Sequence, residues 1–192
     1  MTASTYCNEI NNGSEAPGWN PAINAPGPDY FPLTPDYYIQ SYNRLWYKIG
    51  TAVKLGPAPL DPYYGPQFPY LAYSSNNRDW WIAMMNGIAG ADALFLHSKT
   101  QDNNPANIRS SARFGAEPLT WQYFHFRTIE TALVNVPDRF KTLPVYVTEA
   151  NPQIKDDKVP GWEARNSPWI TECVNYAQSW NAAIGTQPIT GL

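Results

Sequence analysis

Two glutamates, Glu9 and Glu149, each follow an apolar, β-prone segment and are of a type that can carry acid–base and nucleophilic chemistry. Glu9 stands in YCNEINNG and Glu149 in VYVTEANP, where the chain breaks into polar loop residues. Hydrolysis of a glycosidic bond needs one carboxylic acid to protonate the leaving oxygen and one carboxylate to attack the anomeric carbon or activate water. A gap of about 5–5.5 Å between the carboxyl groups gives retention of configuration, and about 6.5–9.5 Å gives inversion.

Histidine supplies a third candidate, because His97 ends the continuous apolar run ADALFLH. A run of this length and composition is typical of a buried strand. His97 either faces a ligand or caps the buried strand through a hydrogen bond. His125 lies in an aromatic segment expected to be helical, where packing is the favoured interpretation.

Strand and helix patterns alternate along the chain, which predicts an α/β fold with a parallel sheet. Thr34-Pro35-Asp36 has the residue types of a helix start. Strands are expected at 3–9, 91–97 and 143–149, with another beginning in QPITGL, and the apolar run at 53–59 could be a further strand. Helices are expected from 34 to near Gly56, around 78–88, and at 126–136 and 167–184.

The long polar loops all follow strands, whereas the connections from helix to strand are short. Ligands of barrels and doubly wound sheets bind at the carboxyl ends of the strands, where loops can grow without disturbing the core. Glu9, His97 and Glu149 are expected at that rim. Aromatic residues in these loops could stack on sugar faces or simply pack the loops, namely Trp19, Tyr63, Tyr64 and Trp162.

Composition and motifs argue against several classes of function, namely nucleic-acid binding, membrane spanning and metal or cofactor chemistry. The 192 residues suit one domain spanning 1–192, and the net charge of −3 makes nucleic acid a poor partner. No stretch approaches the roughly 20 apolar residues of a membrane span, and no secretory signal pattern stands at the start, which leaves the localisation open. Cys7 and Cys173 are expected to be free thiols, and no motif indicates a metal or cofactor.

The segments CNEINNG and VYVTEANP resemble the acid/base and nucleophile strand ends of the clan A glycoside hydrolases, a family of (β/α)8 barrels that includes cellulases and β-glycosidases. The resemblance implies that Glu9 is the general acid/base at the end of strand four and Glu149 the nucleophile at the end of strand seven. It further implies that Asn8 binds the sugar 2-hydroxyl, that His97 approaches the nucleophile from strand six, and that Asn151 lies in the substrate site.

Counted on the family's barrel, the chain corresponds to strands four to seven and the beginning of strand eight. The resemblance therefore implies a partial TIM-type barrel, roughly half of one, with flanking helices. A half barrel leaves open sheet edges and an uncovered core, so we expect two chains to associate as a dimer or the sheet to rearrange.

Two hypotheses of function follow. The first is a retaining hydrolase of β-glycosidic bonds in a poly- or oligosaccharide, with activity that is weak or absent if half the barrel is missing. The second is a non-catalytic carbohydrate-binding or self-assembling half-barrel module. Neither hypothesis requires a cofactor.

Overall fold

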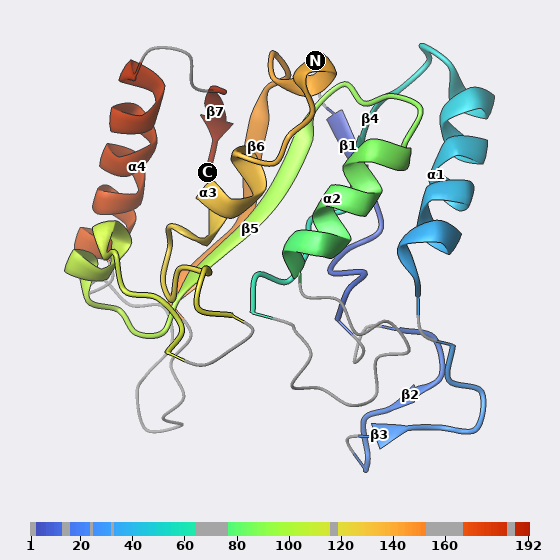
Figure 1. Ribbon diagram of the computed structural model, residues 1–192, viewed down its shortest axis with the longest axis horizontal. Coiled ribbons are helices and arrows are strands. Elements are labelled where there is room, and N and C mark those ends of the chain that lie inside the picture. Colours follow the sequence, from blue (N-terminus) through green and yellow to red (C-terminus); the bar gives the residue numbers. More distant parts are fainter. Residues whose placement is uncertain are drawn as a thin grey trace. The chain divides into compact units, whose positions relative to one another are not determined.

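Parallel strands and helices make up two compact units of the chain (Figure 1). Unit 1 comprises Met1–Phe95 and Asn135–Leu143, and unit 2 comprises Leu96–Val134 and Pro144–Leu192. The α/β class expected from the sequence is confirmed, and the single domain over 1–192 stays a prediction. The computed structural model describes residues 3–12, 16–23, 25–31, 33–63, 77–115, 119–152, 167–183 and 187–192.

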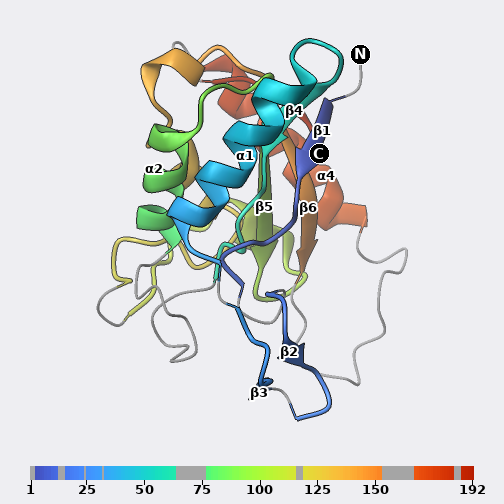
Figure 2. The same ribbon diagram turned by 90° about the vertical axis from the view of Figure 1, so that its right-hand side faces the viewer.

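Unit 1 contains a parallel strand pair, β1 (Ala3–Tyr6) and β4 (Lys54–Pro57), which Figure 2 shows side by side. A parallel pair requires a crossover, and α1 (Pro35–Ile49) lies in the chain between the two strands. A second helix, α2 (Asn77–Gly87), packs against α1. The unit also contains the short 3-10 helix η3 (Asp138–Phe140).

The start of α1 follows its sequence signals. Thr34 is the N-cap, and its side-chain oxygen accepts the N–H of Tyr37 at 3.2 Å, with Pro35 in the first helical position. The helix ends at Ile49, earlier than the apolar spacing predicted, because Gly50 adopts a positive φ of 51° and donates its N–H to Trp46.

Two buried tyrosines of α1 tie the helix to the strand ends. The Tyr38 hydroxyl donates to the carbonyl of Tyr6 at 3.0 Å and accepts the N–H of Ala58 at 2.8 Å. The Tyr42 hydroxyl donates to the carbonyl of Gly90 at 3.0 Å. Burial raises the pKa of both phenols, which therefore remain donors. The residues that follow β1 and β4 are thus held in fixed positions.

The segment after β1 departs from the sequence prediction. The strand expected over 3–9 ends at Tyr6, because Cys7 and Glu9 have positive φ values of 71° and 37°, which no strand contains. The following loop includes a short antiparallel pair, β2 (Trp19–Asn20) and β3 (Ala25–Pro26), where no strand was expected.

Unit 2 is built on a three-stranded sheet in the order β5-β6-β7. The strand β7 (Ile189–Gly191) pairs in parallel with β6 (Val145–Pro152), as the sequence predicted. The long helix α4 (Ser167–Ala182) contacts β7, beside which it stands in Figure 1. The remaining elements are β5 (Leu94–Thr100), whose first two residues belong to unit 1, η2 (Pro105–Arg109) and α3 (Thr128–Leu133).

Three boundaries in this part of the chain correct the sequence prediction. β5 continues to Thr100, so that His97 lies within the strand and not at its end. β6 likewise continues past Glu149 to Pro152. The expected helix over 126–136 is helical only in α3, and Pro137 disfavours helical geometry at Val136.

None of the helices in the described part of the chain combines the length and apolar character that crossing a membrane requires. Cys7 is exposed and Cys173 is buried, and both are free thiols, as expected from the sequence. Burial raises the pKa of the Cys173 thiol to about 12, so this thiol stays protonated at neutral pH.

Candidate functional site

The residues that follow β1 form a tight, polar turn. Asn8 is exposed, whereas Glu9 is only 5% exposed. The carbonyl of Glu9 accepts the N–H of Asn12 at 2.7 Å, which closes the turn around the residue with positive φ. Strained backbone of this kind persists only where surrounding contacts determine it, and it is common at functional sites.

Those contacts come from the segment after β4. The side chain of Asn11 donates to the carbonyl of Asp61 at 3.0 Å and accepts its N–H at 2.8 Å. Asp61 is 7% exposed, and its Oδ1 accepts the N–H of Tyr63 at 2.9 Å. The reciprocal bonds between Asn11 and Asp61 therefore fix the loops after two neighbouring parallel strands against each other.

One amide joins the two buried carboxyl groups of unit 1. Nδ2 of Asn12 lies 3.3 Å from Oε2 of Glu9 and also 3.3 Å from Oδ2 of Asp61. The amide nitrogen can donate one hydrogen to each carboxyl group, so Asn12 holds the two side chains in fixed positions.

Alternate residues of β5 face opposite sides of the sheet in unit 2. Ser98 and Thr100 face the helices: Ser98 Oγ donates to the carbonyl of Phe126 at 2.6 Å, and Thr100 Oγ1 accepts Trp169 Nε1–H at 2.9 Å. By the two-residue period of a strand, His97 and Lys99 share the other face.

Glu149 lies on the neighbouring strand β6 and meets both of these side chains. Nδ1 of His97 and Nζ of Lys99 each lie 3.6 Å from the same carboxylate oxygen, Oε2. The side chains of His97 and Lys99 are 1% and 9% exposed, whereas that of Glu149 is 41% exposed. The sheet thus presents a carboxylate that is open to solvent, with a buried ammonium and an imidazole behind it.

Asn151 lies two residues beyond Glu149 on the same strand, and so on the same face. Its Oδ1 is shielded from solvent and has no hydrogen-bond partner in the described part of the structure. A buried amide oxygen without a donor is costly, so this position favours a ligand that donates a hydrogen bond. Thr148, which precedes Glu149 in the strand, lies on the opposite side, with its Oγ1 3.5 Å from the carbonyl of Leu96.

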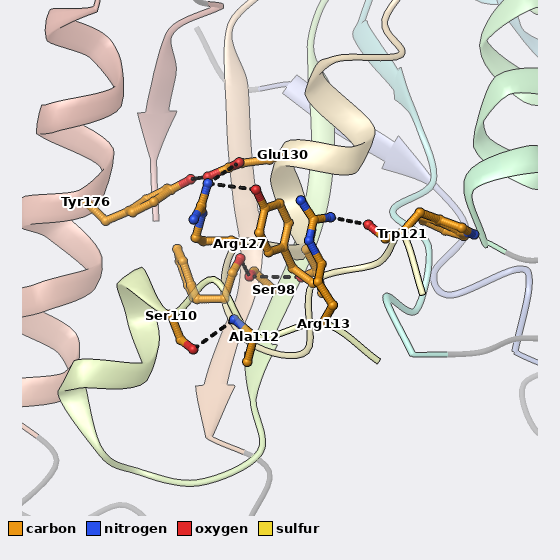
Figure 3. A network of polar contacts seen from close by, with 11 residues as sticks. Ser98, Ser110, Ala112, Arg113, Trp121, Arg127, Glu130 and Tyr176 are labelled. Carbon is orange, nitrogen blue, oxygen red and sulfur yellow. Dashed lines mark hydrogen bonds and ion pairs between the residues drawn. The ribbon is translucent and has the colours of Figure 1, made fainter. Parts of the chain in front are cut away.

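A network of polar contacts in unit 2 links Arg113, Arg127 and Glu130, which follow β5 in the chain, to Tyr176 of α4 (Figure 3). The carboxylate of Glu130 accepts Nε and Nη2 of Arg127 at 2.6 and 2.9 Å and the hydroxyl of Tyr176 at 2.6 Å. The guanidinium groups of Arg113 and Arg127 lie 3.5 and 4.2 Å from the ring centroid of Tyr123. Hydrogen bonding to Glu130 raises the pKa of Arg127, and burial raises that of Tyr176. α3, α4 and the described loop residues 112–115 and 119–124 are thereby joined.

His125, for which packing was the favoured interpretation, lies against an aromatic ring, but it precedes α3 and is not in a helix as expected. It is 7% exposed, its ring contacts that of Phe124 edge-on, and its Nδ1 accepts the N–H of Gln101 at 3.4 Å. Burial lowers the pKa of the His125 imidazole, although Asp102 opposes this effect. The ring is therefore a neutral acceptor in the fold.

Of the four aromatic residues proposed to stack on sugars, Tyr63 has a side chain within the described part of the structure. Tyr63 is half-buried and donates its backbone N–H to Asp61. The backbone of Trp19 forms part of β2, but its side chain lies outside the described part of the structure. Tyr64 and Trp162 lie outside the described residues. Their proposed stacking on sugars stays a prediction.

Two charged residues of the candidate site were missed by the sequence reasoning. Lys99 could have been found from the two-residue period, because it stands two positions after His97 in a strand that extends beyond the apolar run. Asp61 has no such local signal, since its role depends on hydrogen bonds to residues 50 positions away in the chain.

Comparisons of the chain with family models, with curated proteins and with solved structures find no match. Two polar clusters in the described residues point to a function: Glu9 with Asn12 and Asp61, and Glu149 with His97 and Lys99.

Proposed function

We propose that the chain is a glycoside hydrolase-like protein that cleaves β-glycosidic bonds of an oligo- or polysaccharide by a retaining mechanism. Glu149 is the nucleophile and Glu9 the general acid/base, with Asn8, His97 and Asn151 as residues that bind or orient the substrate. The resemblance of the two glutamate segments to the cellulase-like enzymes supports the same assignment.

The observation that carries this proposal is the difference in surroundings between the two glutamates. Glu9 is buried and shares the amide of Asn12 with a second buried carboxyl group, that of Asp61. Glu149 is open to solvent and has the ammonium of Lys99 at 3.6 Å. A retaining glycosidase needs one carboxyl group as acid/base and another as nucleophile, and these different surroundings favour a different role for each glutamate.

The mechanism follows from these assignments. Glu149 attacks the anomeric carbon as Glu9 donates its proton to the departing glycosidic oxygen, and a covalent glycosyl-enzyme is formed. Glu9, now ionised, removes a proton from water, whose oxygen attacks the anomeric carbon and releases Glu149. Retention requires the two carboxyl groups to stand about 5–5.5 Å apart across the substrate.

The proposed architecture is a half barrel of the (β/α)8 type that is completed by a second copy of the chain. The parallel pairs β1/β4 and β6/β7, with helices between successive strands in the sequence, support this architecture. Light scattering tests the association: a particle with the mass of two chains is expected, and a monodisperse monomer contradicts it.

Hydrolysis of aryl β-glycosides and of soluble β-glucans tests the activity. Replacement Glu149→Gln or Glu9→Gln should lower kcat by about 10²–10⁴-fold, because each variant loses a proton-transfer or nucleophilic group at nearly constant size. The matched control is Glu172→Gln, since Glu172 lies on α4 and pairs with Arg109. Activity that survives both substitutions would overturn the assignment.

A second candidate is a carbohydrate-binding module without turnover. The shielded Oδ1 of Asn151 favours binding, because a sugar hydroxyl would supply the missing donor. Calorimetric titration with β-gluco-oligosaccharides separates the two candidates. Binding to the wild type that Asn151→Ala weakens, in the absence of any product, supports the binding module.

A further inference from the structure

We propose that Lys99 is a positioning residue that fixes one oxygen of Glu149 and so selects the other, Oε1, as the attacking atom. This inference rests on the proposed function, because it assigns a role within the same site. It goes further in naming the residue that orients the nucleophile and the oxygen that forms the covalent bond.

The two contacts of the Glu149 carboxylate converge on a single oxygen. Nζ of Lys99 and Nδ1 of His97 both lie 3.6 Å from Oε2. Oε2 is thus the oxygen of Glu149 through which both recorded ion pairs are formed, and the side chain is 41% exposed. The carboxylate is therefore held by one oxygen and presents the other.

A lysine is an energetically unfavourable residue at position 99 of the fold. Its side chain is only 9% exposed, on the face of β5 opposite to Ser98 and Thr100. Burial of an ammonium group is unfavourable unless a partner compensates, and an apolar side chain of similar length would pack there at lower cost. The position thus indicates that the charge itself is used.

The charge has a use in both steps of the reaction. In the first step the bond from Oε1 to the anomeric carbon forms, the bond to the leaving oxygen breaks, and the proton of Glu9 goes to that oxygen. In the second step the bond from Oε1 breaks and its electron pair returns to the carboxylate. The ammonium of Lys99 stabilises the carboxylate that is released and holds Oε2 in place throughout.

Steady-state kinetics of Lys99→Met and Lys99→Arg test the proposal, with Lys141→Met as the matched control. Lys141 is an exposed lysine of unit 1 that pairs with Asp138. Lys99→Met should lower kcat by about 100-fold with KM nearly unchanged, because a misplaced nucleophile costs rate more than binding. Lys99→Arg should recover most of that loss, and Lys141→Met should behave as the wild type.

A second measurement does not depend on turnover. In protein labelled with ¹³C at the glutamate side chain, the Glu149 Cδ resonance at neutral pH should move in Lys99→Met and stay in place in Lys141→Met. A resonance unmoved by Lys99→Met, or equal loss of kcat in the methionine and arginine variants, would overturn the role of Lys99. A wild type without turnover would instead overturn the proposed function, while a moved resonance would still support the contact of Lys99 with Glu149. Thermal unfolding of each variant confirms that the compared proteins are folded.

Discussion

Lys99 and Glu149 lie on neighbouring strands of one sheet, with Nζ 3.6 Å from Oε2 and the ammonium buried behind a carboxylate that is open to solvent. In unit 1, by contrast, the buried Glu9 is joined through Asn12 to another carboxyl group. The two glutamates that the proposed mechanism assigns as nucleophile and acid/base therefore differ in burial and in the charge of their neighbours.

The hydroxyl of Tyr38 should contribute measurably to stability. Tyr38→Phe leaves the N–H of Ala58 without its acceptor and the carbonyl of Tyr6 without its donor, at a residue that is 2% exposed. The expected loss is about 1–3 kcal/mol of the free energy of unfolding, measured in urea. Tyr47→Phe is the control, because Tyr47 is 76% exposed, and equal effects of the two substitutions would contradict the assignment.

His125 should make the protein less stable in mild acid. Burial lowers its pKa in the folded state, so below about pH 6.5 the unfolded chain binds a proton that the folded chain does not. Stability should fall as the pH decreases from the unfolded value through the folded one. His125→Gln should reduce this dependence in urea titrations between about pH 7 and 5, and an identical slope would refute the explanation.

Gly56 should tolerate no side chain. A Cβ at this position would lie against the carbonyl oxygen of Ala93 and the ring of Phe95, closer than van der Waals contact permits. Gly56→Ala is expected to cost about 1–3 kcal/mol in unfolding experiments. Gly115→Ala has open space around its Cβ and serves as the control, with little change expected.

Local signals in the sequence located α1, whose start Thr34 caps, and the strands β6 and β7, although α1 ends earlier and β6 later than predicted. They failed where tertiary contacts decide the backbone. β1 ends at Tyr6 because Cys7 adopts a left-handed backbone conformation, which no pattern in the sequence predicted. Buried polar residues were also difficult to predict. Ser98 and Lys99 are polar, so the predicted strand stopped at His97, but both residues belong to β5. A hydrogen bond of Ser98 and an ion pair of Lys99 satisfy these side chains in the buried strand.

The candidate site was predictable only in part for the same reason. Apolar runs located Glu9, His97 and Glu149, because each follows or ends a strand-like segment. Asp61 and Asn12 act through contacts between distant loops, which a single sequence does not reveal.

The most direct test of the central claim is to trap the covalent intermediate. A 2-deoxy-2-fluoro β-glycoside with an activated leaving group slows release of the glycosyl-enzyme, so that peptide mass spectrometry after digestion can locate the attached sugar. We expect one fluorosugar per chain, on Glu149, and none in Glu149→Gln. An enzyme that turns over β-glycosides while the label is absent, or attached to another residue, would contradict the account.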